Sequence, residues 1–108
     1  MSEPARRPIT VVGSLMVDVF ARAPSWPTPS RITHGEFGLI DSGGKGANQA
    51  LIAARMGWPT CLIGCVGLDW IGAALLAQLN AGGVDTTRVL RTAMDPTGLF
   101  IALSTDKQ

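Results

Sequence analysis

Residues 42–57 read SGGKGANQALIAARMG, and this stretch decides the fold. Three of the four residues 43–46 are glycines, and they end the extended pattern that precedes them. Apolar residues then recur at the helical positions i, i+3, i+4 and i+7, namely Ala47, Ala50, Leu51 and Ala54. Because Gly57 can adopt the left-handed conformation that ends a helix, the stretch predicts a glycine-rich turn followed by a helix.

On both sides of this stretch, apolar runs predict buried strands that alternate with helices. We expect strands at residues 9–14, 60–66, 88–92 and 97–104. Between them, Asp69 is a suitable N-cap for a second helix that ends at Gly82 and Gly83. Strands separated by helices are typical of βαβ units, so the sequence predicts an α/β fold with a Rossmann-like parallel sheet and flanking helices.

Residues 17–23 and 32–40 are expected to form two further strands with a different pattern. Thr33, His34 and Glu36 lie among apolar residues there, as is typical of a strand with one face in water. Such strands do not fit a plain doubly wound sheet, and they indicate a small β lid beside it. We therefore expect the lid at about residues 17–40 and the α/β core at residues 9–14 and 43–108.

The glycine-rich turn does not match the common nucleotide-binding motifs. A Walker A loop requires an earlier glycine and a Ser or Thr after the lysine, whereas Gly46 follows Lys45. The dinucleotide fingerprint GxGxxG fails because Gln49 stands at the position of its last glycine. His34 is the only histidine, and it has no partner at metal-ligand spacing. A dinucleotide-binding module is therefore disfavoured.

The same turn has the composition of a small-molecule site. Gly43 and Gly44 would let the backbone approach a ligand closely, with free N–H groups of the helix end pointing outward. Lys45 adds a cation, and Asn48 adds a donor and an acceptor. Asp18 follows the first buried strand, at the sheet edge where α/β proteins bind ligands, and its carboxylate could grip two sugar hydroxyls. The alternative is an ordinary tight turn with a solvated lysine.

Composition excludes several classes of partner. The 108 residues carry nine Lys and Arg against eight Asp and Glu, and these charges are dispersed, which argues against nucleic acid and anionic membranes. No apolar stretch is long enough to span a bilayer and none resembles a secretory signal, so we expect a cytoplasmic protein.

Cys61 and Cys65 share one apolar strand and are expected to be buried free thiols.

Three motifs together resemble the ribokinase-like carbohydrate kinases. They are VVGSLMVD at residues 11–18, GGKGANQA with AARMG at residues 43–57, and GCVGLDWIG at residues 64–72. The resemblance implies a ribokinase-like fold and ATP-dependent phosphorylation of a primary sugar hydroxyl with Mg²⁺. It also implies that the sugar is bound by five residues, namely Asp18, Gly43, Gly44, Lys45 and Asn48.

The resemblance covers only the N-terminal part of such a kinase domain. In that family the catalytic base lies in a later GAGD-type motif beside the ATP site, so we expect no catalytic or ATP-binding residue in residues 1–108. The chain would be a truncated, N-terminal sugar-binding part. Two alternatives are a non-catalytic sugar-binding remnant and a family member that acts on a nucleoside or another sugar.

Two positions depart from the family pattern. Met16 stands where ribokinases usually have an asparagine two residues before the aspartate, which removes an amide contact and puts ribose as the substrate in question. Arg31 replaces an acidic residue in the lid, where the resemblance implies a homodimer contact. We therefore expect a homodimer through the lid, with a lid edge that differs from the family's at Arg31.

Overall fold

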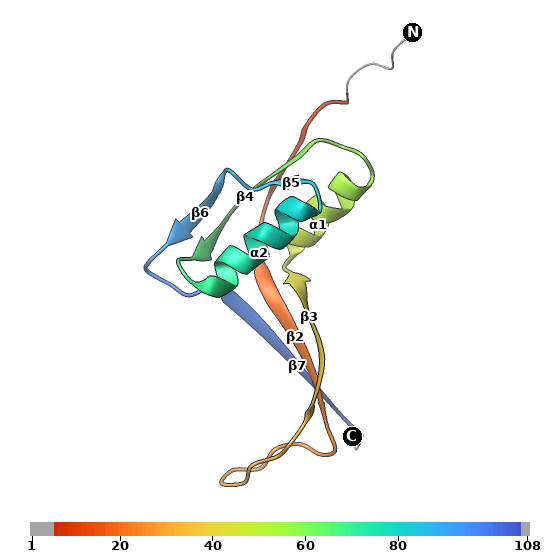
Figure 1. Ribbon diagram of the computed structural model, residues 1–108, viewed down its shortest axis with the longest axis vertical. Helices are drawn as coiled ribbons and strands as arrows, with labels where there is room; N and C mark the ends of the chain where they lie inside the picture. Colours follow the sequence, from red (N-terminus) through yellow and green to blue (C-terminus); the bar gives the residue numbers. More distant parts are fainter. Residues whose placement is uncertain (1–5, 107–108) are drawn as a thin grey trace.

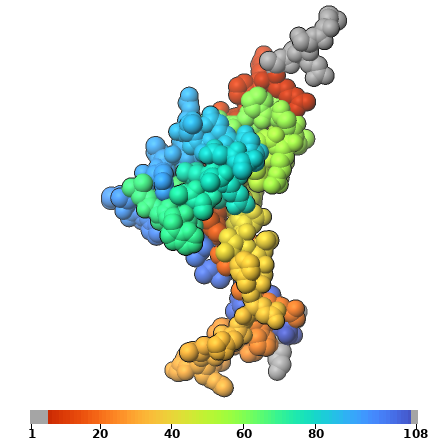
Figure 2. Space-filling view, in the orientation of Figure 1, coloured from red at the N-terminus to blue at the C-terminus, as the bar shows by residue number. Residues whose placement is uncertain are grey.

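The computed structural model describes residues 6–106, which form an α/β core with a β-sheet arm projecting from it (Figure 1). The core carries the two helices and four strands, and the arm carries three long strands. The space-filling view shows a narrow waist between the core and the far end of the arm (Figure 2). This arrangement matches the predicted α/β sheet with a β lid, and the arm is called the lid from here on.

The core sheet is parallel throughout, with β4 (Thr60–Gly67) at its centre. On one side it pairs with β1 (Ile9–Val12) in the register Ile9 to Thr60. It also pairs with two short strands, β5 (Val84–Asp85) near its start and β6 (Val89–Thr92) near its end. The crossovers between these parallel strands run through the helices, as the alternating sequence pattern predicts.

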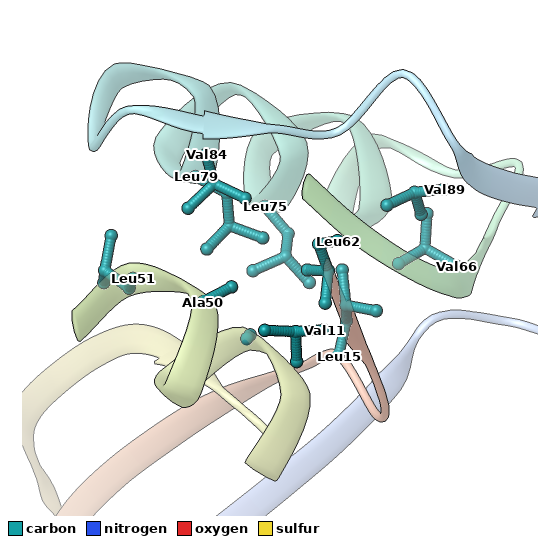
Figure 3. Close-up of a cluster of buried hydrophobic side chains, with 11 residues drawn as sticks. Val11, Leu15, Ala50, Leu51, Leu62, Val66, Leu75, Leu79, Val84 and Val89 are labelled. Atoms are coloured by element: carbon teal, nitrogen blue, oxygen red, sulfur yellow. The ribbon is translucent and has the colours of Figure 1, made fainter. Parts of the chain in front are cut away.

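Two helices pack against the core sheet, α1 (Lys45–Arg55) and α2 (Trp70–Ala81). Asp69 is the N-cap of α2, and its side chain accepts a hydrogen bond from the N–H of Gly72 at 2.7 Å, as predicted. The buried cluster between helices and strands is shown in Figure 3 and includes Val11, Leu15, Ala47, Ala50, Leu51, Leu62, Val66, Leu75, Leu79, Val84 and Val89. Leu62, Leu75 and Leu79 are its largest fully buried side chains.

The lid is a three-stranded sheet in the order β3-β2-β7. β2 (Met16–Ala23) runs antiparallel to β3 (Glu36–Gly43) and parallel to β7 (Gly98–Thr105). The assignment of residues 98–105 to the core was therefore wrong, because β7 pairs with β2 over its whole length, from Met16 with Gly98 to Ala23 with Thr105. An apolar strand pattern predicts a strand but does not determine its partner.

Two further expectations need correction. The strand expected at residues 32–40 begins at Glu36 and continues to Gly43, so the lid runs directly into the glycine-rich turn. Cys65 is exposed and Cys61 is half-buried, so the prediction of two buried thiols was wrong. On β4, the side chains of Leu62 and Val66 are buried in the core, whereas Cys65, near the end of the strand, is exposed to solvent.

Candidate functional site

The turn between β1 and β2 packs directly on the start of α1. A Cβ atom on Gly46 would lie 2.6 Å from the carbonyl carbon of Gly13, so no side chain fits between these two backbones. Ser14 makes the contact polar as well as close, since its carbonyl accepts from the N–H of Ala47 at 3.0 Å and its Oγ accepts from the N–H of Lys45 at 3.1 Å. Ser14 therefore caps α1 from another segment, because the N-cap Gly44 has no side chain to do so.

Two glycines shape the floor of the site. Gly44 has φ +91° and ψ 146°, a conformation that is essentially restricted to glycine, and a Cβ there would lie 2.6 Å from the carbonyl oxygen of Ser14. A Cβ on Gly43 would overlap the carboxylate of Asp18. The absence of both side chains lets the β2 carboxylate lie against the turn.

These segments enclose an open pocket of about 430 Å³. Its lining consists of Ser14, Met16, Asp18, Gly44, Lys45, Asn48 and Phe100. Four of the five predicted site residues are thus brought together, and the fifth, Gly43, lies against the Asp18 carboxylate. Asp18 and Asn48 face one pocket although they lie on a lid strand and a core helix.

The pocket offers complementary polar groups to a ligand. Asp18 supplies a carboxylate acceptor, Lys45 an ammonium with three donors, and Asn48 an amide that both donates and accepts. The backbone contributes less than expected, because the N–H groups of Lys45 and Ala47 are bonded to Ser14 instead of pointing outward freely. A ligand in this pocket would therefore be bound through side chains, whose groups suit a polyhydroxylated or anionic molecule.

Sequence reasoning missed two residues of the pocket, Ser14 and Phe100. Ser14 gave a weak signal, as a hydroxyl residue directly after a buried strand. Phe100 gave none, because it reaches the pocket only through the pairing of β7 with β2, in which it stands opposite Asp18.

A hydrogen-bonded junction fixes the position at which β7 enters the lid. Asp69 accepts from the N–H of Thr97 at 2.8 Å and from its hydroxyl at 2.7 Å, in addition to the N–H of Gly72. These bonds, led by the one from the Thr97 N–H, hold the pKa of the Asp69 carboxyl below its ordinary value. Arg91 donates to the carbonyl of Asp69 at 3.0 Å, so the junction joins the end of the core sheet to the first residue before the lid strand.

Three other kinds of site were considered within residues 6–106: a second cavity, a metal site and a membrane-spanning helix. A cavity of about 470 Å³ near the far end of the lid is lined by an exposed ion pair, Arg22 with Asp106, and contains no predicted site residue. No three His, Cys, Asp or Glu side chains come together as a metal-ligating group in that range. No helix within it has the length and hydropathy to cross a membrane.

Comparison with known proteins assigns the family. The profile of the pfkB family carbohydrate kinases matches residues 6–108. The chain belongs to this family. Among pfkB carbohydrate kinases it is 36% identical to the ribokinase of Haemophilus influenzae over 94 residues, which is 87% of this chain and 31% of that one. It is 31% identical to the deoxyribokinase of Salmonella typhi over 91 residues, covering 84% and 30% of the two chains.

A solved ribokinase structure has the same fold over the aligned residues. The Arabidopsis thaliana ribokinase complexed with ribose and ATP superposes with a TM-score of 0.88 at 30% identity, covering 95% of this chain and 34% of that one. The prediction of a ribokinase-like α/β fold is thereby confirmed. The chain spans about a third of the length of each of these three relatives.

Proposed function

We propose that this chain is the sugar-binding part of an ATP-dependent carbohydrate kinase that phosphorylates a primary hydroxyl of ribose or a similar sugar. The observation that carries the proposal is the convergence of Asp18, Gly44, Lys45 and Asn48 on one open pocket. Family membership supports the reaction class, and the pocket supports the part that this chain plays in it.

Each residue has a role that follows from its chemistry. The Asp18 carboxylate accepts hydrogen bonds from two adjacent hydroxyls and so orients the sugar ring. Asn48 and Lys45 bind further hydroxyls from the α1 side of the pocket, while Gly43 and Gly44 leave the room that the carboxylate and the sugar need. Holding the acceptor hydroxyl in place is one of the three requirements of phosphoryl transfer.

The other two requirements, a phosphate cradle and a base, are assigned to the rest of the kinase domain. We propose that ATP and Mg²⁺ are used by the whole protein and that residues 1–108 alone do not transfer phosphate. The test is ATP consumption by the purified chain with ribose and with 2-deoxyribose. Turnover above the blank would contradict this assignment, and a blank-level rate is expected.

Sugar binding by this chain is tested by removing the carboxylate. Asp18→Ala should weaken D-ribose binding about tenfold or more, because hydrogen bonds to a charged group are worth roughly 1.5–3 kcal/mol. Asp95→Ala is the matched control, since Asp95 is an exposed carboxylate outside the pocket. Saturation-transfer NMR measures both variants. Equal binding by the wild type and Asp18→Ala would overturn the proposed role of the pocket.

Ribose and its close analogues are the candidate substrates. Relatives at comparable identity include a ribokinase and a deoxyribokinase, and an asparagine that is usual in ribokinases is replaced by Met16 here. A nucleoside substrate and a non-catalytic sugar-binding role are the remaining alternatives. The proposal also includes a cytoplasmic location and a homodimer through the lid. Its partners are small sugars, and neither nucleic acid nor a membrane is expected among them.

A further inference from the structure

The strand that carries the proposed sugar carboxylate lies between two outer strands of the lid. In the order β3-β2-β7, Asp18 of β2 stands in register with Asp41 of β3 and Phe100 of β7. The position of Asp18 relative to the start of α1 therefore depends on what holds β3 and β7 to the core. Both outer strands are hydrogen-bonded to α2 or to its N-cap, although α2 does not line the pocket.

The β7 side of the lid is anchored at the N-terminus of α2. Thr97, the residue before β7, donates its N–H at 2.8 Å and its hydroxyl at 2.7 Å to the carboxylate of Asp69. The same hydroxyl accepts from the N–H of Gly67, at the end of β4, at 3.0 Å. Thr97 is 6% exposed, so these bonds are shielded from water. A buried and fully bonded network is rigid, and this one fixes where β7 enters the lid.

The β3 side of the lid is anchored in the last turns of the same helix. The side-chain amide of Gln78 donates to Oδ1 of Asp41 at 2.9 Å, and the same oxygen accepts from the N–H of Ser42 at 2.8 Å. Asp41 does not line the pocket, although it stands directly opposite Asp18. Two carboxylates at opposed positions repel each other, so the two donors stabilise the Asp41 charge where Asp18 would otherwise destabilise it.

Between the two anchors, the contact of α2 with the lid is apolar and incompletely filled. A cavity of about 130 Å³ lies there, with Val17, Val19 and Leu99 on its lid side and Ile71 and Leu75 on its helix side. The two valines alternate along β2 with the pocket-facing carboxylate, so the cavity lies on the opposite face of the lid from the pocket. Apolar contacts are non-directional, and the unfilled space leaves them room to shift. The directional constraint on the lid therefore comes from the hydrogen bonds at the two ends of α2.

We infer that α2 positions the Asp18 carboxylate from outside the pocket, by holding both outer strands of the lid. The two anchors are Asp69 with Thr97 and Gln78 with Asp41. None of these four residues lines the pocket, so they are positioning residues and not sugar ligands. This inference rests on the proposed sugar-binding function and adds the residues outside the pocket that set its affinity.

The β3 anchor is tested by exchanging its donor and its acceptor. Gln78→Ala removes the donor, and Gln78→Glu places a second carboxylate against Asp41. Each should raise the dissociation constant of D-ribose about twofold to fivefold at neutral pH, a modest effect because the bond is exposed. Asp41→Asn keeps an oxygen that accepts from Gln78 and should bind ribose as the wild type does. Gln78→Glu combined with Asp41→Asn re-forms the bond in the opposite direction and should restore the affinity.

The β7 anchor is tested at its buried threonine. Thr97→Val keeps the shape of the side chain but removes the hydroxyl that bonds to Asp69 and Gly67, so ribose binding should weaken about fivefold or more. Thr97→Ser keeps the hydroxyl and should keep the affinity. Thr86→Val is the matched control, because Thr86 is 7% exposed and its hydroxyl bonds to Asn80, away from the lid. It should lower the free energy of unfolding and leave ribose binding unchanged.

The readouts separate positioning from a purely structural role. Amide NMR titration gives the dissociation constant of ribose, and urea denaturation gives the stability of each variant. If Gln78→Ala and Thr97→Val lower stability but bind ribose as the wild type does, the inference is overturned. If Thr97→Val does not fold, the Gln78 series decides, and an unrestored affinity in the exchanged pair contradicts the inference. If the wild type binds neither D-ribose nor 2-deoxy-D-ribose, the proposed sugar-binding function itself is contradicted.

Discussion

At the scale of single residues, the proposed site depends on glycines that have no Cβ where two segments come into close contact. Gly44 has a backbone conformation that other residues avoid, and Gly43 leaves the volume that the Asp18 carboxylate occupies. Gly13 and Gly46 allow the β1–β2 turn to touch the start of α1. Ser14 then completes the helix end with two hydrogen bonds. The side chains of the proposed sugar site are therefore positioned by backbone contacts that leave no room for a Cβ.

Gly44→Ala is expected to destabilise the protein by about 2 kcal/mol or more. The strained backbone alone costs roughly 1–3 kcal/mol, and the new Cβ also approaches the Ser14 carbonyl. Gly83→Ala is the matched control, because Gly83 has a similar φ of +93° but its Cβ would lie 3.6 Å from the nearest atom, in ordinary contact. Urea denaturation measures both. A loss for Gly44→Ala no larger than that for Gly83→Ala would show that the overlap with Ser14 is unimportant.

The Asp69 junction makes a pH prediction. A carboxyl whose pKa is lowered in the folded state stabilises folding while it is ionised. That contribution is fully present above the unfolded pKa of about 4 and is lost as the pH falls through the lower folded value. Unfolding free energy should therefore decline on acidification below about pH 4, and less steeply in Asp69→Asn. If the free energy of unfolding falls equally steeply below pH 4 in the wild type and in Asp69→Asn, the stabilising role of this carboxylate is contradicted.

At the scale of elements, α2 and β4 hold the core together. Leu75 and Leu79 of α2 pack with Leu62 of β4, and all three are almost completely buried (Figure 3). β4 in turn pairs with β1, β5 and β6. The α2 helix also begins at the Asp69 junction, which anchors the entry of β7 into the lid. The pocket is thus supported by elements that do not line it.

Truncation of Leu79 tests this packing. Leu79→Ala should lower the free energy of unfolding by about 2–5 kcal/mol, because the side chain is fully buried and leaves a cavity. The control is Ile52→Ala on α1, a position that is 57% exposed, where the loss should stay below about 1 kcal/mol. Chemical denaturation compares the two, and similar losses would argue against the α2–β4 contact as the main core.

At the scale of the whole molecule, the lid leaves much apolar surface uncovered. Ile40, Val19 and Ile101 stand in one row across the three lid strands, and Ile40 and Ile101 are more than half exposed. Strand alternation puts this row on the face opposite Asp18. Large exposed apolar patches mark interaction surfaces, and the proposed lid homodimer would cover this one.

Charging that row tests the proposed homodimer. Ile40→Lys combined with Ile101→Lys should shift the chain toward monomer in sedimentation velocity, since a lysine in an apolar contact costs several kcal/mol. Leu90→Lys on the core is the control, because Leu90 is exposed but lies on β6, outside the lid. A wild-type chain that is monomeric at high concentration would contradict the homodimer.

The local parts of this structure were predictable from the sequence, and the long-range parts were not. Glycines at residues 43, 44 and 46 and a carboxylate after the first strand indicate a site through their own chemistry. The partner of β7, and with it the presence of Phe100 in the pocket, depends on pairing between segments about 80 residues apart, which no local pattern determines. The exposure of Cys65 depends in the same way on what covers the end of β4.

The central claim is that Asp18, Lys45 and Asn48 form one sugar-binding pocket, and chemical-shift mapping tests it most directly. In a titration with D-ribose and 2-deoxy-D-ribose, the amide signals of Gly44, Lys45 and Asn48 should move together and saturate at one concentration. Those of Gly82 and Gly83, at the far end of α2, should stay still. Shifts centred elsewhere in the chain, or no saturable shift with either sugar, would contradict the claim.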